Sequence, residues 1–352
     1  MTVRVIPATE AAARLAEFSQ VIDARSESEY AEDRLPGAVN WPSLNDEERA
    51  LVGTIYKQVS PFEARKRGAG LVVANISRHI AREVVDKPRE WQPLVYCWRG
   101  GKRSGVLADL LDQIGFKVTM VQGGYKAFRT AVLADLPVLA QRLQYQVVCG
   151  LTGSGKTRLL KALEQRGAQV LDLEGLAQHR GSVLGLMPGE TQPSQKHFDM
   201  RVWDKLRHFD PARPVYVESE SKKVGNVTVP ESLIHAMRAS PCVWVDLSME
   251  ERVELLLEDY AWFVRDPEYF CGRLQALVEL RGAAVVKDWH EKVRAGQFRE
   301  VFRDLLERHY DPGYSTSIRR NFQQLGTART VAPRDRSMAA MDAVAGELLT
   351  AG

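Results

Sequence analysis

One cysteine of this chain sits where a nucleophilic thiol is expected. Cys97 follows the apolar run 94–96 and opens a loop with two glycines and three basic residues, after which a helical pattern begins. Glycines let successive backbone N–H groups point inward, and the following helix N-terminus adds partial positive charge. A lone cysteine is more often a small buried hydrophobe, but strand end, glycines and cations coincide here. We predict an anion-binding loop that favours the thiolate, made of Trp98, Arg99, Gly100, Gly101, Lys102, Arg103 and Ser104.

A second loop has the composition of a phosphate-binding loop. Segment 150–157 reads GLTGSGKT and lies between the apolar pair 147–148 and a helical pattern, which is the context that the G-x-x-x-x-G-K-[ST] motif requires. The predicted diphosphate-binding residues are Gly150, Gly153, Ser154, Gly155, Lys156 and Thr157. Backbone N–H groups would cradle the diphosphate, Lys156 would neutralise it, and Thr157 is the residue that would hold Mg²⁺.

The acidic partner of such a loop is less evident. Glu218 follows the apolar run 215–217, and Asp246 follows 243–245, so either is a candidate for the metal-binding acid at a strand end. Neither is an obvious counterpart of the aspartate that binds the metal in such proteins. The sequence therefore predicts phosphate binding without establishing nucleotide hydrolysis.

Parallel strands and covering helices are needed to position both loops. Short apolar runs alternate with longer segments of helical period, which is typical of an α/β fold with parallel sheets. The predicted strands are 21–23, 94–96, 118–121, 146–149, 170–173, 215–217 and 243–246. The predicted helical segments are 104–114, 124–142 and most of 249–310.

Pro137 interrupts this pattern before the second sheet begins. Proline is a common punctuation mark between elements, so we place a first domain at 1–136, a linker at 137–145 and a second domain at 146–352. The second domain would end in a helical extension and, after Pro312, a polar basic tail.

Composition limits the remaining possibilities. The chain has 352 residues, enough for two domains, and its net charge of +3 permits an anionic partner without requiring one. Its four cysteines are widely spaced with no CxxC pair, which argues against a zinc site or a disulfide framework. No run approaches the ~18 apolar residues of a membrane span. We expect a cytoplasmic protein without membrane association; its oligomeric state is left open.

The first half resembles the rhodanese family over most of residues 5–130. The matching segments are the cysteine loop, 21–26, 29–30, 35–40, 115–118 and 122–125. In that family the cysteine carries a chalcogen atom as a persulfide or perselenide. Arg103 lies one residue further from the cysteine than in common sulfurtransferase loops, as in rhodanese-related phosphatases. The wider ring suggests a guest of phosphate or selenophosphate size.

A rhodanese-like half followed by a P-loop half resembles the tRNA 2-selenouridine synthase family. Further matching segments are 172–177, 179–182, 192–195 and 218–225. The resemblance implies a transferase that replaces sulfur by selenium in the wobble 2-thiouridine of tRNA. It implies selenophosphate and geranyl diphosphate as substrates, a geranylated 2-thiouridine intermediate, and no tightly bound cofactor. Expected partners are the anticodon region of tRNA and a selenophosphate-supplying enzyme.

Other residues have both a functional and an ordinary interpretation. His179, Arg180 and Glu218 would line a cleft in which tRNA reaches both loops, although the first two suit a solvated surface equally well. Residues 313–336 hold five arginines against one acid; Arg319, Arg320 and Arg329 are candidate tRNA contacts or a solvated tail. Four aromatic residues are candidates for a prenyl pocket: Trp262, Phe263, Tyr269 and Phe270. Aromatic residues in helices more commonly pack in the core.

Different functions remain open on these residues alone. One alternative is a P-loop kinase or nucleotidase fused to a rhodanese-type sulfurtransferase or phosphatase. The wide Cys97 loop also permits an arsenate reductase. A phosphate-sensing module without catalysis is the third alternative.

Overall fold

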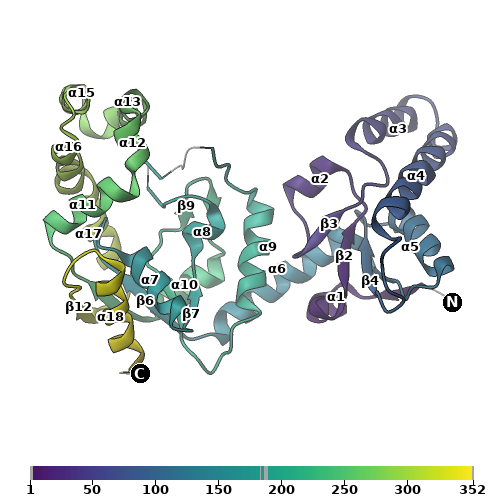
Figure 1. Ribbon diagram of the computed structural model, residues 1–352, viewed down its shortest axis with the longest axis horizontal. Helices are drawn as coiled ribbons and strands as arrows, with labels where there is room; N and C mark the ends of the chain where they lie inside the picture. The colour runs from purple at the N-terminus through teal and green to yellow at the C-terminus, as the bar shows by residue number, and fades with distance from the viewer. Residues whose placement is uncertain (1–2, 183, 186–188, 351–352) are drawn as a thin grey trace. The chain divides into compact units, whose positions relative to one another are not determined.

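The computed structural model describes residues 3–182, 184–185 and 189–350, in two compact units (Figure 1). The first unit comprises Met1–Asp135 together with Lys196–Asp204. The second comprises Leu136–Gln195 and Lys205–Gly352. Each unit is built on a parallel sheet covered by helices, so the predicted α/β class is confirmed.

The sheet of the first unit has the strand order β1-β5-β4-β2-β3, with every pairing parallel. Its strands are β1 (Arg4–Ile6), β2 (Gln20–Asp23), β3 (Ala38–Asn40), β4 (Pro93–Tyr96) and β5 (Thr119–Val121). The helices are α1 (Ala8–Ala13), η1 (Leu15–Glu17), α2 (Glu27–Glu32), α3 (Asp46–Gln58), α4 (Pro61–Glu83), α5 (Lys102–Ile114) and α6 (Gly124–Arg142). β4 is buried along its whole length, as expected for a central strand with both faces covered, and it delivers Cys97 at its carboxyl end.

The linker placed at 137–145 is largely helical, as the helical pattern predicted over 124–142 indicated. Helix α6 runs from Gly124 to Arg142 with Pro137 inside it, and β6 begins at Tyr145. Proline removes one helical hydrogen bond, but the neighbouring apolar side chains Leu136, Leu139 and Ala140 are buried. The free energy gained by packing these side chains outweighs the loss of one helical hydrogen bond. The segment between the helix and the second sheet is therefore only two residues long.

Helix α9 (Gln195–Leu206) comes from the second half of the sequence, yet most of it groups with the first unit. The Nε1–H of Trp203 donates to Asp135 on α6 at 2.8 Å, and the Trp203 ring packs edge-on against Phe128. Nothing in the local sequence indicated this exchange, because the partners are about seventy residues apart.

The sheet of the second unit has the order β12-β11-β6-β8-β7, also parallel throughout. Its strands are β6 (Tyr145–Cys149), β7 (Gln169–Leu171), β8 (Val215–Glu218), β11 (Pro241–Val245) and β12 (Gln324–Val331), beside a short hairpin of β9 (Lys223–Val224) and β10 (Val227–Thr228). The covering helices include α7 (Lys156–Gln165), α8 (Leu173–Ala177), α10 (Glu231–Ala239) and α18 (Met338–Thr350). α18 packs against α7 through Met341, Val344 and Ala345 in one apolar core.

A helical region follows β11, as the sequence predicted. It consists of α11 (Met249–Asp259), α12 (Ala261–Arg265), α13 (Pro267–Leu274), η2 (Gln275–Leu277), α14 (Val278–Arg281), α15 (Ala283–Arg294), α16 (Phe298–Leu305), the π-helical turn η3 (Leu306–Tyr310) and α17 (Asp311–Asn321). Within the described ranges, no helix is both long and apolar enough to cross a membrane.

The expectation of a basic tail after Pro312 was wrong. This segment forms α17, strand β12 and helix α18. The sequence did not predict β12 because its composition is polar. In the structure β12 pairs in parallel with β11, with Val243 opposite Arg329 and Val245 opposite Val331. Hydrogen bonds to β11 determine its conformation, and an edge strand tolerates polar side chains.

Candidate functional site

The segment after β6 folds as a glycine-dependent phosphate loop. Gly150, Gly153 and Gly155 all have positive φ, at 154°, 76° and 85°, a region that other residues adopt with strain. A Cβ on Gly150 would lie 2.5 Å from the Oγ of Ser154. Helix α7 starts directly afterwards, with Gly155 as its N-cap. The loop and the helix N-terminus together form the anion-binding geometry expected from the motif.

Lys156 is nearly buried at the start of this helix. Its Nζ donates to the carbonyls of Gly150 and Leu151 at 2.8 and 3.2 Å, and lies 3.5 Å from a carboxylate oxygen of Glu218. Burial lowers the pKa of Lys156, but the nearby Tyr314 and Glu218 more than offset this and raise it. The ammonium group is therefore held charged beside the loop.

Three carboxylates gather at the mouth of the phosphate loop. The oxygens of Glu174, Glu218 and Glu220 lie within 4.8 Å of one another, and the hydroxyl of Thr157 donates to Glu218 at 3.1 Å. Burial and the charge of Glu218 raise the pKa of Glu220 to about 8, and the same causes raise that of Glu174. Such a set of hard oxygen donors fits Mg²⁺.

The two acidic candidates from the sequence therefore differ in position. Glu218 contacts Thr157 and Lys156, whereas Asp246 is exposed and does not line the pocket at the loop. The sequence analysis did not assign Glu174 and Glu220, although the repeated acid at positions 218 and 220, just past a strand, was an available signal.

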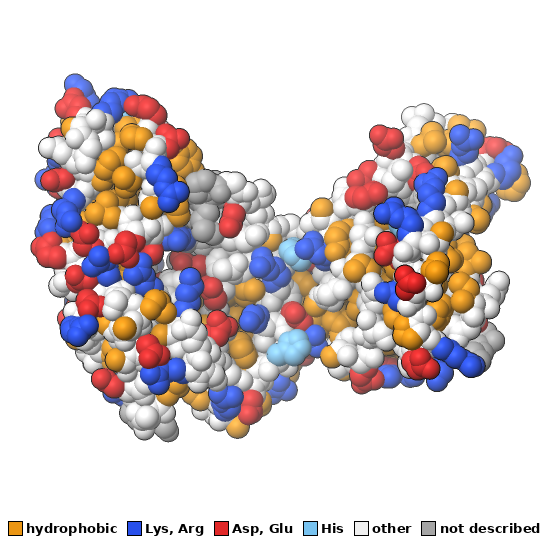
Figure 2. Space-filling model, viewed as in Figure 1, with side chains coloured by type: hydrophobic (Ala, Val, Ile, Leu, Met, Phe, Trp, Pro, Cys, Tyr) orange, Lys and Arg blue, Asp and Glu red, His pale blue; other side chains and the backbone are white. Residues whose placement is uncertain are grey.

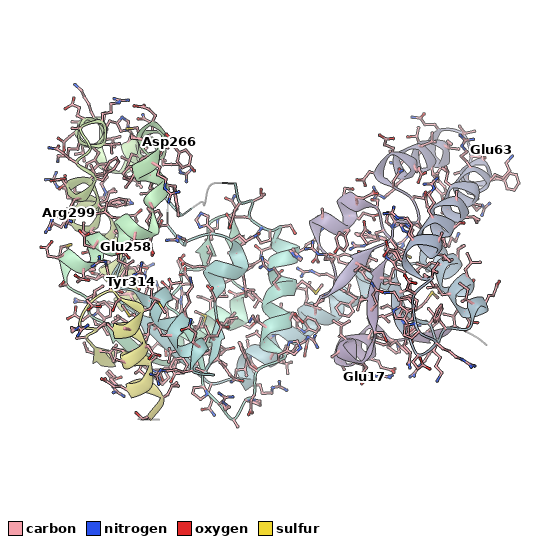
Figure 3. The ribbon with its side chains drawn as sticks, in the orientation of Figure 1. Glu17, Glu63, Glu258, Asp266, Arg299 and Tyr314 are labelled. Carbon is pink, nitrogen blue, oxygen red and sulfur yellow. The ribbon has the colours of Figure 1, made fainter. Side chains whose placement is uncertain are left out.

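A pocket of about 470 Å³ opens beside the phosphate loop. Its walls come from the loop itself, from α11, and from η3 and α17, including Tyr314 (Figure 3). Leu255, Leu256, Tyr260 and Tyr310 give it an apolar and aromatic side. The backbone of the phosphate-type loop and apolar side chains thus line one cavity.

The predicted lining of this pocket needs two corrections. Arg180 lines it, but His179 is not among its walls; His179 is buried nearby, where burial and Arg273 lower its pKa. The four aromatic residues proposed for a prenyl pocket pack instead in the core of the helical region. These residues, which mainly contact one another, are Trp262, Phe263, Tyr269 and Phe270.

The thiol loop of the first unit surrounds a buried sulfur. Cys97 is 3% exposed, and the hydroxyl of Ser104 donates to its Sγ at 3.2 Å. The start of α6 holds the loop from the other side: the N–H of Tyr125 donates to the Cys97 carbonyl at 2.8 Å, and that of Lys126 to the Trp98 carbonyl at 3.0 Å. Because a Cβ on Gly124 would lie 2.3 Å from the Cys97 carbonyl oxygen, only glycine fits there.

The basic residues of this loop have different partners. The Nη1 of Arg103 pairs with Glu29 at 2.9 Å, and that contact lowers the pKa of Glu29 against the opposing effect of burial. Arg99 and Lys102 are exposed. Arg99 and Lys102 are thus the residues left to meet an anion, whereas Arg103 is held by a carboxylate.

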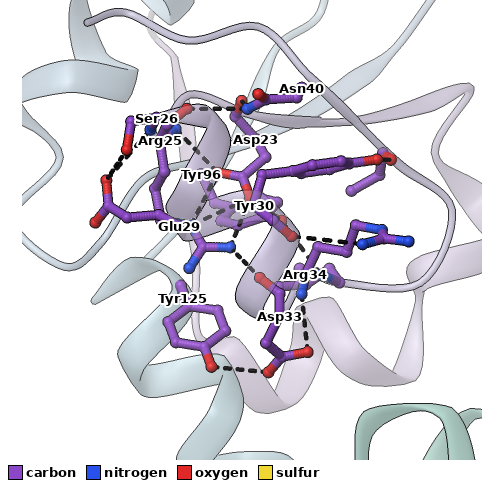
Figure 4. A network of polar contacts seen from close by, with 12 residues as sticks. Asp23, Arg25, Ser26, Glu29, Tyr30, Asp33, Arg34, Asn40, Tyr96 and Tyr125 are labelled. Carbon is purple, nitrogen blue, oxygen red and sulfur yellow. Dashed lines mark hydrogen bonds and ion pairs between the residues drawn. The ribbon is translucent and has the colours of Figure 1, made fainter. Parts of the chain in front are cut away.

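A polar network, drawn in Figure 4, contacts the loop through Tyr125. Trp98 stacks on Tyr125 with 5.4 Å between ring centroids, and the hydroxyl of Tyr125 donates to buried Asp33 at 2.7 Å. The guanidinium of Arg25 lies 4.1 Å from the centre of the Tyr125 ring and donates to the Asp33 carbonyl at 2.6 Å. His197 of α9 contacts the same carboxylate at 3.3 Å. The loop therefore packs, through Trp98, against a connected network of polar and aromatic side chains.

The arginines proposed for tRNA contact lie on the surface of the second unit. Arg319 and Arg320 are exposed on α17 and border a shallow depression with Ser315 and Thr316. Arg329 is exposed on β12. In Figure 2, basic and acidic side chains are interspersed on the visible face.

Two family models match the chain. The tRNA 2-selenouridine synthase AAA domain matches residues 143–269, and the rhodanese-like domain matches residues 7–131. A solved rhodanese-related protein from Thermoplasma volcanium is 18% identical and covers 36% of this chain and 89% of its own, with a TM-score of 0.24.

Curated relatives extend the likeness across both units. A tRNA 2-selenouridine synthase of Sulfurovum sp. is 30% identical over 87% of this chain and 90% of its own length. That of Nitrosomonas europaea is 39% identical over 68% of this chain. The matches to the relatives from Nitrosomonas europaea, Nitrosomonas eutropha and Alcanivorax borkumensis span 63%, 62% and 66% of those proteins.

Proposed function

Because this chain belongs to the tRNA 2-selenouridine synthase family, we propose that it replaces sulfur by selenium in the wobble 2-thiouridine of tRNA. The proposed substrates are selenophosphate and geranyl diphosphate, and the proposed intermediate is geranylated 2-thiouridine. The observation that carries the proposal is that one chain holds a phosphate-type loop beside a partly apolar pocket and a second glycine-containing loop around a buried thiol.

Two loops suit a reaction of two chemical steps. A thione sulfur is a poor leaving group. In the first step the sulfur attacks C1 of the prenyl donor, the C–O bond to diphosphate breaks, and the base loses its N3 proton. In the second step selenium from selenophosphate attacks C2 and the geranyl thiolate departs, while water takes the phosphoryl group. The first step requires stabilisation of a leaving diphosphate, the second a site for selenophosphate.

We assign the prenyl donor to the pocket of the second unit. The backbone N–H groups of the phosphate loop would hold the diphosphate, and Lys156 would turn from its carbonyl partners towards it. Leu255, Leu256 and Tyr310 line the same pocket and offer apolar surface to a hydrocarbon chain. We propose this lining for the prenyl chain in place of the four aromatic residues that the sequence suggested.

Mg²⁺ fits this site as well. Thr157 and Glu218 would hold it, with Glu174 and Glu220 close enough to contribute. When bound, the ion would neutralise charge on the leaving diphosphate.

We assign selenophosphate to the loop around Cys97. The N-terminus of α5 and the exposed cations Arg99 and Lys102 suit a dianion, and Ser104 would orient the sulfur. Cys97 is the group proposed to contact the selenium. The rigid support under Trp98 and Tyr125 keeps this loop in one conformation before a ligand arrives.

The proposed partners are tRNA, through its anticodon region, and an enzyme that supplies selenophosphate. The exposed arginines at 319, 320 and 329 are suited to phosphate contacts that position RNA without reading its sequence.

Nucleoside mass spectrometry of tRNA tests this function. Cells that lack the protein and are complemented with wild type should contain 2-selenouridine. Complementation with Lys156→Ala should leave 2-thiouridine, and with Cys97→Ala should accumulate geranylated 2-thiouridine. If wild type restored none of these nucleosides but the purified protein phosphorylated a substrate with ATP, the kinase alternative would replace our proposal.

A further inference from the structure

The pocket beside the phosphate loop is lined by four cationic side chains. Three of them have carboxylate partners. Lys156 lies 3.5 Å from Glu218, and Arg158 and Arg180 both contact Asp259, at 3.1 and 3.3 Å. These three charges are compensated before any ligand binds.

The fourth cation, Arg281 at the end of α14, has no carboxylate within ion-pair distance among the described residues. Its Nε donates to the Nδ1 of His309 at 3.0 Å, and its Nη2 donates to the His309 carbonyl at 3.2 Å. The group is only partly exposed. A half-buried cation without a counter-charge is unfavourable in the free protein, so its place on a pocket wall points to an anionic ligand.

His309 adds a second donor to this wall. Its Nδ1 accepts from Arg281, which leaves the ring proton on Nε2. Burial and the charge of Arg281 lower the pKa of His309, so the ring is neutral. The residue belongs to the π-helical turn η3, a rare conformation often found at functional sites, and its ring packs edge-on against Tyr310.

The neighbouring helix α17 has one side in the pocket and another on the surface. On α17, Gly313, Tyr314 and Ser317 line the pocket. Arg319 and Arg320, together with Ser315 and Thr316, border the shallow depression on the same helix. With about 3.6 residues per turn these two sets lie on different sides of α17, so Arg319 and Arg320 lie outside the pocket that Arg281 lines.

We propose that Arg281 and His309 bind a backbone phosphate of the acceptor RNA next to the reacting base. This inference rests on the proposed function, since it places RNA in the pocket of the prenyl donor. The phosphate loop already provides the donor's anion site, so a separate, uncompensated arginine is left for another anion. The partly exposed ring of Tyr310 lies on the same wall and offers a surface on which an unstacked base can lie, as in single-stranded RNA recognition.

The test uses the full chain and an anticodon stem–loop RNA that contains 2-thiouridine. Arg281→Ala should weaken RNA binding by roughly tenfold or more, as expected for a charged hydrogen bond. The slope of log K against log salt should fall by about 0.7 to 0.9, the value for one phosphate contact. Affinity for geranyl diphosphate should stay unchanged. Arg281→Gln removes the charge but keeps amide donors, and should lower the slope equally.

Arg308→Ala is the matched control. Arg308 lies on the same π-helical turn, its side chain is 60% exposed, and its ion-pair partner among the described residues is Asp304, at 3.7 Å. It does not line the pocket, so RNA affinity and salt slope should remain those of wild type.

Four results would overturn the inference. An unchanged salt slope in both Arg281 variants would remove the phosphate contact. A loss of geranyl diphosphate affinity without a loss of RNA affinity would assign Arg281 to the donor. If wild type bound no RNA, the proposed function would fail together with the inference; if wild type bound and modified RNA and Arg281→Gln did so equally well, only the inference would fail.

Discussion

Removing the ammonium group of Lys156 should stop the prenyl step while leaving the thiol loop intact. Lys156 is 8% exposed, and its Nζ makes hydrogen bonds to two loop carbonyls. In the transition state these bonds would be exchanged for bonds to the leaving diphosphate. A charged hydrogen bond at such a position contributes about 2 to 4 kcal/mol, so Lys156→Ala should slow geranylation by roughly 30- to 1,000-fold.

The same substitution also removes a positive charge from the acidic cluster. Glu218 loses the cation at 3.5 Å, and Glu174 and Glu220 lose a nearby positive charge. Lys156→Met removes the same charge but keeps most of the side-chain volume, so a comparison of the two variants shows whether lost packing contributes to the effect. Melting temperatures of both variants report any loss of folding.

The assay is transfer of a geranyl group to 2-thiouridine in an anticodon stem–loop, followed by mass spectrometry of the nucleosides. A second reaction starts from pre-geranylated RNA and selenophosphate. The variants should fail in the first reaction and proceed at wild-type rate in the second. Normal geranylation by folded Lys156→Ala would refute the assignment of the donor diphosphate to the phosphate loop.

The remaining predictions concern the thiol, the surface arginines and the buried acids. Cys97→Ala should abolish selenium incorporation with tRNA affinity kept; normal 2-selenouridine formation would remove the thiol from the chemistry. Replacing Arg319, Arg320 and Arg329 by alanine should lower the salt slope of tRNA binding by about two, since three contacts contribute roughly 0.7 to 0.9 each; a filter-binding series with an unchanged slope would contradict this. The pKa of Glu220 is raised from 4.5 to about 8, so between these pH values the folded protein keeps a proton on Glu220 that the unfolded protein loses. The protonated Glu220 therefore stabilises the fold at low pH, and this contribution is lost as pH rises from 4.5 to about 8. Glu220→Gln should therefore flatten that part of the melting-temperature profile without added Mg²⁺; an unchanged profile would count against the burial of this carboxyl.

Both loops were predictable because their residues are contiguous. A strand, a glycine-rich turn and a helix N-terminus follow one another at Cys97 and again at Gly150. Backbone N–H groups of one short segment create each anion site, so no distant residue is needed to define it. The central strands were predicted for a similar reason: β4, β6 and β8 are short apolar runs. The strands β1 and β3 were not predicted; each has three residues, and parallel pairing with β5 and β2 defines them as strands.

Tertiary structure alone decided how these loops are completed. Glu174, Glu218 and Glu220 converge from two segments, and each ordinary acidic residue becomes unusual only when its neighbours lie within 4.8 Å. Arg281 and His309 meet across 28 positions of helical sequence in which neither stands out. Arg103 looked like a free cation until the fold paired it with Glu29.

The polar segment after Pro312 shows the same limit in the backbone. Its composition suggested a solvated tail, but hydrogen bonds from β11 make part of it a sheet strand, and the packing of α18 on α7 anchors the end. Local sequence determines which conformations a segment can adopt and which groups it offers. Burial, ion pairing and strand pairing depend on residues far away in the chain. These tertiary contacts decided which polar side chains line the pocket and which are already paired within the protein.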